Sequence, residues 1–124
     1  MARPVVFDAS ALIAYVKGEP GAATVRDAFR EDCYASAAQW SEVAAYFSDS
    51  WLEWQVASAL LLSQGLLLEP VSIEDAVQAG RMRALQNNLS LGDRLCLALA
   101  MRLGAVAFTG DRAWGRSRNI RQIR

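Results

Sequence analysis

The feature that most constrains the fold of this chain is a regular alternation of short apolar runs with longer segments of helical periodicity. Each run is shorter than an average helix. Short, continuous apolar runs are characteristic of strands that are buried on both faces of a sheet. They are "PVVF" (4–7), "CYA" (33–35), "LLLEPV" (66–71) and "AVAF" (105–108), and "RNIRQIR" (118–124) is a candidate for a fifth, edge strand. Strands that alternate with helices predict a mostly parallel sheet of four or five strands, covered by helices on both faces.

Segments with helical spacing separate these runs. We expect helices over 9–18, 22–31, 36–48, 51–65, 72–86 and 91–102. Three serines precede a side chain that fits a capping box at the start of a helix: Ser36 with Gln39, Ser72 with Asp75, and Ser90 with Asp93. The chain has no repeat and no linker, so residues 1–124 are interpreted as a single α/β domain with three layers, α/β/α.

Composition excludes several kinds of site. The chain has no histidine, and its two cysteines, Cys33 and Cys96, lie far apart in apolar segments. A zinc site or a histidine-based triad therefore cannot be assembled, and any metal ion would be bound by oxygen atoms. No apolar run is long enough to cross a membrane, and the first residues do not resemble a signal peptide. We therefore expect a cytoplasmic protein with reduced thiols and no contact with membranes.

The net charge of zero hides an uneven distribution of charge. Residues 1–80 contain 4 basic and 11 acidic side chains, a net charge of −7, whereas residues 81–124 contain 9 and 2, a net charge of +7. An arginine-rich half favours a polyanionic or acidic partner. Two halves that interleave in the fold would mix these charges, so charge alone leaves both interpretations open.

Two of the apolar runs are followed by an aspartate. Asp8 comes directly after 4–7, and Asp111 follows 105–108 in "TGD". Open parallel sheets bind their ligands at the carboxyl ends of the strands, so both side chains are expected at the edge where a site forms. Aspartate is also a common N-cap, and each residue can begin the next helix without any further role.

Two further carboxylates lie on predicted helices. Glu42 lies off the apolar stripe of the helix over 36–48, which suits either a solvated face or a face that lines a cleft. Asp93 falls in the first turn of the helix over 91–102, where it fits the capping box. A capping role and a catalytic role are compatible at this position, and the local sequence does not separate them.

Together these segments resemble the PIN domain, and within it the VapC-type ribonuclease toxins of bacterial and archaeal toxin–antitoxin pairs. The resemblance runs from about residue 4 to 121, through "VVFDASALIAYVKGEPG", "WSEVAAYF", "LSLGDRLCLALA" and "AVAFTGDRAW". Within these segments the acidic residues that match the family occur in the order that the family has, which is Asp, Glu, Asp, Asp. The resemblance implies an acidic cluster that binds one or two Mg²⁺ ions, or Mn²⁺ in their place, with two supporting polar side chains. The cluster is Asp8, Glu42, Asp93 and Asp111, and the supporting residues are Ser10 and Thr109.

The chemistry of these side chains is consistent with that implication. Without histidine, hydrolysis of a phosphodiester needs a metal ion to activate water and to offset charge on the phosphate, and Mg²⁺ prefers carboxylate oxygens. We expect Asp8, Asp93 and Asp111 to hold the metal, and Glu42 to help bind it or to orient the attacking water. The resemblance implies an endoribonuclease that leaves 5′-phosphate and 3′-hydroxyl ends and inhibits translation by cutting tRNA or ribosomal RNA.

A basic rim would bring RNA to an acidic pocket. The candidates are Arg112, Arg116, Arg118 and Arg121. Trp114 lies among them, where it either stacks on an unpaired base or packs beneath the last strand.

The resemblance also implies two protein partners. One is an antitoxin whose C-terminal segment covers the site, and the other is a second copy of the chain in a homodimer. Trp51, Leu52 and Trp54 lie near the break at 48–50 and are candidates for such a contact, although packing in the core explains them equally well.

Three alternatives compete with this interpretation. A receiver-type signalling domain also has an acidic Mg²⁺ pocket, but it needs a lysine at the end of a late strand, where this chain has "TGD". A haloacid-dehalogenase-type phosphatase needs D-x-D after the first strand, where this chain has "DAS". A PIN-fold module that binds RNA or a protein without cleaving RNA is the third, and the intact acidic set argues against it.

Overall fold

A parallel sheet of five strands forms the centre of the molecule. The computed structural model describes residues 2–85 and 88–124. The strands are β1 (Val5–Phe7), β2 (Cys33–Ser36), β3 (Leu67–Glu69), β4 (Val106–Thr109) and β5 (Ile120–Gln122). Their order is β3-β2-β1-β4-β5, and every pair is parallel. The predicted fold class is confirmed, and the fifth strand forms at an edge.

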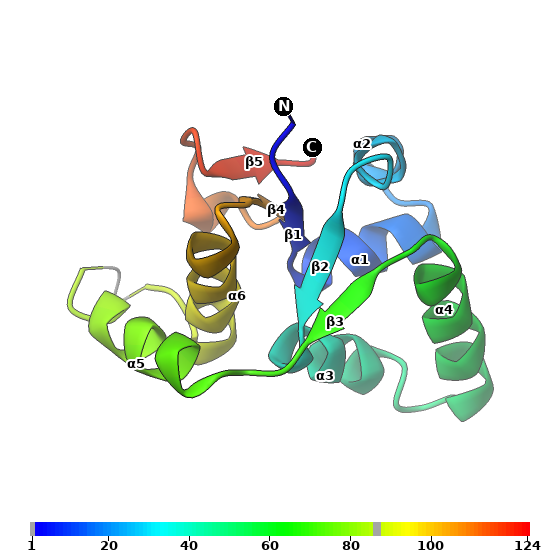
Figure 1. The fold of residues 1–124 in the computed structure, drawn as a ribbon. Helices are drawn as coiled ribbons and strands as arrows, with labels where there is room; N and C mark the ends of the chain where they lie inside the picture. The colour runs from blue at the N-terminus through cyan, green and yellow to red at the C-terminus, as the bar shows by residue number, and fades with distance from the viewer. Residues whose placement is uncertain (1, 86–87) are drawn as a thin grey trace.

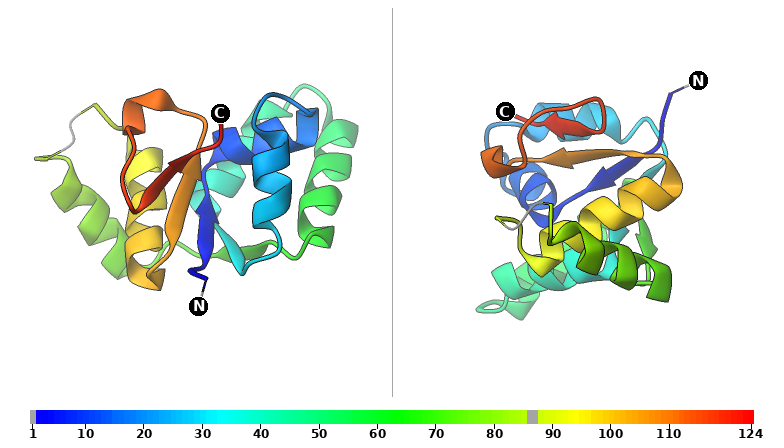
Figure 2. Two further views of the ribbon diagram at one scale, coloured as in Figure 1. Left: turned by 90° about the horizontal axis from the view of Figure 1, so that it is seen from above. Right: turned by 90° about the vertical axis from the view of Figure 1, so that its left-hand side faces the viewer.

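Helices connect the strands and cover both faces of the sheet (Figures 1 and 2). They are α1 (Ala9–Lys17), α2 (Ala22–Ala28), α3 (Ala37–Tyr46), α4 (Trp51–Ser63), α5 (Ile73–Met82) and α6 (Leu91–Leu103), and a 3₁₀ turn covers Arg112–Trp114. Because successive strand residues face opposite sides, Phe7 packs in the core beneath α1 to α4, while Val6 packs in the core beneath α5 and α6.

β1 is the central strand, and its pairing positions the site. It pairs with β2 on one side and with β4 on the other. In the second pair Val5 lies opposite Val106 and Phe7 opposite Phe108. The next residue of β4, Thr109, is therefore brought beside Asp8 at the carboxyl edge of the sheet, although 101 positions separate the two in the chain.

Of the capping boxes expected at the starts of α5 and α6, only the second forms in full. Ser90 Oγ accepts a hydrogen bond from the backbone N of Asp93 at 3.1 Å, and Asp93 Oδ2 accepts one from the backbone N of Ser90 at 3.0 Å. Ser72 Oγ likewise accepts from the backbone N of Asp75 at 3.0 Å. The Asp75 carboxylate, however, pairs with Arg102 at 2.9 Å and joins α5 to α6.

α5 is shorter than the sequence predicts. It ends at Met82, whereas its predicted end, Gln86, lies outside the described residues. Both cysteines are buried free thiols, as expected, and burial raises the pKa of Cys33 to about 12. None of the helices in the described residues is long and apolar enough to cross a membrane.

Candidate functional site

Three acidic side chains from separate elements meet at the carboxyl edge of β1. Asp8 follows β1 and begins α1, Glu42 lies within α3, and Asp93 lies in the first turn of α6. Burial raises the pKa of Asp8 and of Glu42, and the negative charge of Asp93 raises both further. The charge of Asp8 also raises the pKa of Glu42. The three carboxylates are therefore close enough to repel one another.

Asp8 is the buried member of this group, with only 4% of its surface exposed. Its Oδ1 accepts hydrogen bonds from Ser10 Oγ at 2.7 Å and from the backbone N of Ala11 at 2.8 Å. Its Oδ2 accepts one from Thr109 Oγ1 at 2.5 Å. These bonds favour the charged carboxylate, but the cost of burial is larger, so the pKa of Asp8 is raised overall.

The two hydroxyls that donate to Asp8 are oriented by the backbone after β4. The backbone N of Gly110 donates to Ser10 Oγ at 2.9 Å, and the backbone N of Asp111 donates to Thr109 Oγ1 at 2.9 Å. A hydroxyl has a single proton. Because each hydroxyl already accepts a bond from an amide, its own proton is directed at Asp8. Ser10 and Thr109, which the sequence predicts as supporting side chains, thus hold this carboxylate directly.

Asp93 is held by its own helix. Its Oδ2 completes the capping box with Ser90, and its Oδ1 makes no hydrogen bond within residues 2–85 and 88–124. Asp93 is also only half-buried. Capping therefore uses one oxygen of Asp93 and leaves the other available at the site, so the two roles considered from the sequence are compatible in the structure.

Glu42 lies against the first turn of α6, where a glycine makes room for it. A Cβ added at Gly92 would lie only 2.7 Å from Glu42 Oε1, which is closer than real Cβ contacts come. The absence of a side chain at Gly92 thus creates the space that the Glu42 carboxylate occupies beside Asp93.

Gln39 is the residue of this site that the sequence did not reveal. The predicted capping box with Ser36 is wrong, because Ser36 Oγ accepts from the backbone N of Ala38 at 3.1 Å and the Gln39 side chain turns inward, 1% exposed. Gln39 Oε1 accepts from the backbone N of Ala9 at 2.8 Å, and Nε2 donates to the carbonyl of Gly92 at 2.7 Å. Gln39 therefore ties the first turn of α1 to the first turn of α6, and these turns carry the two aspartates.

Asp111 lies at the margin of the group. It is exposed and begins the 3₁₀ turn, where its Oδ1 accepts from the backbone N of Ala113 at 2.9 Å. Its charge is not among the influences on the pKa of Asp8 or of Glu42. The structure thus brings three of the four predicted carboxylates together. The fourth, Asp111, is connected to them through the bond from its backbone N to Thr109 Oγ1.

The donor set suits a hard divalent cation by its chemistry. As the side chains stand, the described residues contain no group of three His, Cys, Asp or Glu side chains placed to hold a metal ion. The available ligands are nevertheless all oxygens, which Mg²⁺ and Mn²⁺ prefer. One Asp93 oxygen has no partner in the described chain, and a cation would relieve the repulsion between the carboxylates.

Comparison with known proteins identifies the family. A family model of the PIN domain matches residues 5–118. The chain belongs to the PIN domain family. A search of curated proteins by sequence finds no match.

Solved structures share the fold of this PIN domain across nearly its whole length. A toxin–antitoxin complex from Klebsiella pneumoniae has a TM-score of 0.81 at 20% identity and covers 97% of this chain and 98% of its own. VapBC2 from Rickettsia felis, bound to a DNA fragment from its promoter, has a TM-score of 0.75 at 15% identity and covers 96% of each chain. DNA-bound VapBC from Salmonella typhimurium has a TM-score of 0.71 at 18% identity and covers 98% and 97%.

The basic candidates of this PIN domain separate into two groups. Arg112 and Arg116 line a hollow of about 570 Å³ beside the 3₁₀ turn that follows β4. Arg118 and Arg121 line a different hollow, of about 390 Å³, which reaches the amino ends of β1 and β4. The first hollow is also lined by Gln122, whose Nε2 donates to the carbonyl of Asp111 at 2.9 Å. Trp114 is 7% exposed and belongs to the core beneath α6, so it packs in the interior and does not present a face for stacking.

Arg94, the residue after Asp93, lies in the interior. It is buried, and its Nη1 donates to the carbonyl of Ala79 at 2.7 Å. It therefore joins α6 to α5 from within and does not contribute to the basic rim.

The outward side of α4 is apolar and open. Trp51 is 62% exposed and Leu52 is 70% exposed, and Leu52 and Val56 line a hollow of about 580 Å³ shared with α1 and α3. Trp54 differs, because its ring packs against that of Trp40 with centroids 5.0 Å apart. Core packing thus explains Trp54 but leaves Trp51 and Leu52 unexplained.

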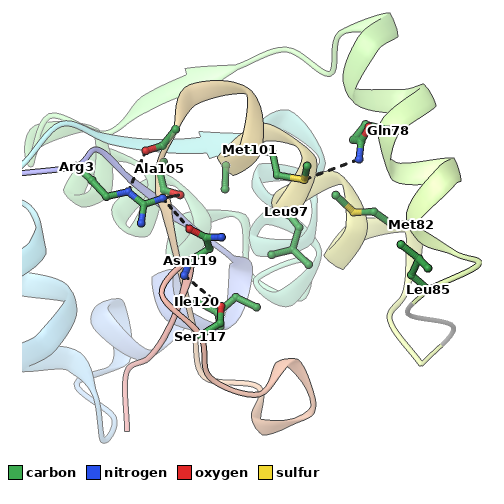
Figure 3. Close-up of a pocket in the computed structure, with 12 residues that line it drawn as sticks. Arg3, Gln78, Met82, Leu85, Leu97, Met101, Ala105, Ser117, Asn119 and Ile120 are labelled. Carbon is green, nitrogen blue, oxygen red and sulfur yellow. Dashed lines mark hydrogen bonds between the residues drawn. The ribbon is translucent and has the colours of Figure 1, made fainter.

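A further pocket, of about 510 Å³, lies at the opposite edge of the sheet (Figure 3). Apolar side chains of α5 and α6, including Leu97 and Met101, line much of it. Arg3 lies at one side, where it donates to the carbonyl of Ala105 and to Asn119 Oδ1. None of the lining residues is acidic within the part of the chain that the structure describes, so this pocket does not belong to the carboxylate site.

Proposed function

We propose that this PIN domain is a metal-dependent endoribonuclease that acts in the cytoplasm as the toxin of a toxin–antitoxin pair. The observation that carries the proposal is the convergence of Asp8, Glu42 and Asp93 from three elements at the carboxyl edge of the sheet. Packing such groups together costs free energy, and clusters of this kind with raised pKa values are characteristic of functional sites.

Each carboxylate has a distinct task in this proposal. Asp8 supplies a fixed ligand, Asp93 supplies the oxygen that its capping bond leaves available, and Asp111 is a further ligand at the margin. Bound Mg²⁺ or Mn²⁺ would activate water and offset charge on the phosphate. No histidine is present to accept a proton. Glu42, whose pKa is raised by burial and by two neighbouring charges, orients the attacking water through its carboxylate.

The proposed substrate is tRNA or ribosomal RNA, cut to leave a 5′-phosphate and a 3′-hydroxyl. Support for RNA comes from the resemblance to VapC-type toxins and from two arginines, Arg112 and Arg116, which line a hollow beside the turn that follows the carboxyl end of β4. A PIN-fold module that binds RNA or a protein without cleaving RNA is the alternative.

The test is cleavage by the purified protein. With Mg²⁺ or Mn²⁺ it should cleave RNA, and EDTA should stop the reaction. Asp93→Asn should slow cleavage by at least about a hundredfold, because it removes a charged ligand. The side-chain oxygen of asparagine can still accept the hydrogen bond from the backbone N of Ser90, so the unfolding temperature should change little. Asp27→Asn, at an exposed carboxylate on α2, is the matched control and should cleave normally.

Two results would contradict the proposal in different ways. A folded Asp93→Asn variant that cleaves as fast as wild type would remove Asp93 from the site. A wild-type protein that binds RNA but leaves it intact at every metal concentration would favour the non-cleaving module.

The proposed antitoxin contact is the exposed apolar side of α4. The similar structures include toxin–antitoxin complexes, and a hollow lined by Leu52 and Val56 suits an apolar side chain of a bound segment. A second copy of the chain, in a homodimer, is the other proposed partner. Leu52→Asp should weaken antitoxin binding by at least about tenfold in titration calorimetry and leave RNA cleavage unchanged. Unchanged antitoxin affinity would place the contact elsewhere.

A further inference from the structure

The segment after β5 brings an arginine to the same edge of the sheet as the carboxylates. The backbone N of Ile123 donates to the carbonyl of Thr109 at 3.0 Å, so the chain continues alongside β4 beyond the end of β5. This pairing places Arg124 beside Gly110, the residue that follows Thr109. Thr109 in turn donates to Asp8.

The Arg124 guanidinium lies over Gly110. A Cβ added at Gly110 would lie 2.9 Å from Nη2 and 3.1 Å from Cζ of Arg124, and 3.4 Å from Ser10 Oγ. The guanidinium and the Ser10 hydroxyl therefore approach the same point in space. Because Ser10 Oγ bonds both oxygens of Asp8, at 2.7 and 2.9 Å, a positive charge is placed at the margin of the acidic cluster.

Arg124 is held there by a neutral partner. Its Nη1 donates to the carbonyl of Pro20 at 3.2 Å, in the turn between α1 and α2. Among the residues described, Arg124 has no acidic partner within ion-pair distance, and its Nη2 donates no hydrogen bond. A guanidinium fixed by one nitrogen, with donors to spare, has the form that binds phosphate oxygens.

We propose that Arg124 binds a phosphate of the RNA strand and positions it against the acidic cluster. The inference rests on the proposed function. Carboxylates repel a polyanion, and a cation at their margin offsets this repulsion where a phosphate has to approach. Arg124 is thereby a substrate-positioning residue, contributed by the segment that follows the last strand, β5.

Three variants of the full chain test the proposal. Arg124→Gln removes the charge, and Arg124→Lys keeps it. Gly110→Ala leaves the arginine in the chain but inserts a Cβ at the place that its guanidinium occupies. Gly110 does not have a positive φ, and the displaced group is the flexible end of a side chain, so this change should not affect folding. Arg26→Gln, at an exposed arginine on α2, is the control for loss of charge.

The measurement is the affinity for a short, fluorescently labelled single-stranded RNA of mixed sequence, in EDTA and over a range of salt concentrations. Arg124→Gln should bind about tenfold more weakly, as expected for loss of a charge-assisted contact. The slope of log affinity against log salt should become shallower by about 0.7. Arg124→Lys should keep the slope, Gly110→Ala should bind more weakly at an unchanged unfolding temperature, and Arg26→Gln should match wild type. With Mg²⁺, Arg124→Gln should raise KM more than it lowers kcat.

Other outcomes would overturn the proposal. If a folded Arg124→Gln variant has the affinity and salt slope of wild type, Arg124 does not bind phosphate, whether or not the wild-type protein cleaves RNA. If Arg124→Gln instead unfolds early and lysine does not restore RNA binding, the residue only braces the turn at Pro20. Failure of wild type to cleave RNA would contradict the proposed function alone, since the binding comparison does not depend on cleavage.

Discussion

The first turns of α1 and α6 each present an aspartate to the same site, but they hold it by different means. Asp8 depends on hydroxyls from Ser10 and from Thr109, and Thr109 is 101 positions away in the chain. Asp93 depends on a reciprocal pair with Ser90, three positions away. One carboxylate is therefore positioned by the assembled sheet, and the other by a single turn of helix.

The two aspartates also differ in their exposure to solvent. Asp8 is buried, and protein donors reach both of its oxygens, so it has little freedom to move. Asp93 is half-buried and keeps one oxygen without a partner in the described residues. Gln39 joins the two turns through its amide. A rigidly held carboxylate, Asp8, and a less constrained one, Asp93, can therefore share a site, because the buried amide of Gln39 fixes the distance between their helices.

Removing that link should have the largest effect. Gln39→Leu would leave the backbone N of Ala9, the first residue of α1, without its partner and would remove the second hydrogen bond to the carbonyl of Gly92. An unpaired amide costs about 1–3 kcal/mol and a lost hydrogen bond about 1 kcal/mol more, so the free energy of unfolding in urea should fall by about 3 kcal/mol, and cleavage should fall with it. Gln55→Leu, at an exposed glutamine on α4, is the control and should change stability by less than about 0.5 kcal/mol. A Gln39→Leu variant as stable as wild type would show that the two turns are held by other contacts.

The two aspartates should respond differently to loss of the hydroxyl that supports each of them. Thr109→Val removes a donor to Asp8 and leaves the backbone N of Asp111 unpaired, so stability should fall by about 1–3 kcal/mol and cleavage by about 10–100-fold. Ser90→Ala removes a helix cap worth about 1 kcal/mol, but the backbone of residue 90 still donates to Asp93. Cleavage by the second variant should fall less than about tenfold. If Thr109→Val and Ser90→Ala lose cleavage equally, support from a distant strand and support from the local helix turn do not differ in their effect on the site.

A smaller effect is expected from filling the space beside the first turn of α6. Gly92→Ala would place a Cβ 2.7 Å from Glu42 Oε1 and displace that carboxylate. Cleavage should fall about tenfold. The unfolding free energy should stay the same or rise by up to about 1 kcal/mol, since alanine favours a helix. Gly80→Ala on α5, where a Cβ meets nothing within 4 Å, should give the stability gain alone. Normal cleavage by Gly92→Ala would indicate that Glu42 tolerates the shift.

The smallest effect is a dependence of stability on pH, measured in EDTA against Asp8→Asn. Burial raises the pKa of Asp8, so the folded protein holds this proton more tightly than the unfolded chain does. The resulting stabilisation is complete below the unfolded pKa, near 3.8, and is lost as the pH rises through the folded pKa. Across that window wild type should lose unfolding free energy relative to Asp8→Asn in urea titrations. The opposite trend would mean that hydrogen bonding outweighs burial at Asp8.

Features set by neighbouring residues could be predicted from the sequence. The alternation of apolar runs and helical segments indicated the parallel sheet, and the spacing of Ser90 and Asp93 indicated the capping box. The same spacing led to a wrong prediction at Gln39, because its longer side chain reaches backbone groups 30 and 53 positions away. Arg124 shows the same limit, since its bond to Pro20 spans 104 positions. The roles of the four carboxylates in catalysis remain predictions.

The place of β1 in the sheet has a consequence for the moment at which activity can appear. β1 needs β4 as a neighbour, and Asp8 needs Thr109, which the ribosome adds 101 residues later. At about 5–20 residues per second, the nascent chain carries Asp8 for several seconds without its second hydroxyl. If the proposed function holds, a nuclease is synthesised next to ribosomal RNA during this interval while its own site is unfinished. The topology thus delays completion of the site until synthesis has passed β4, independently of any inhibitor.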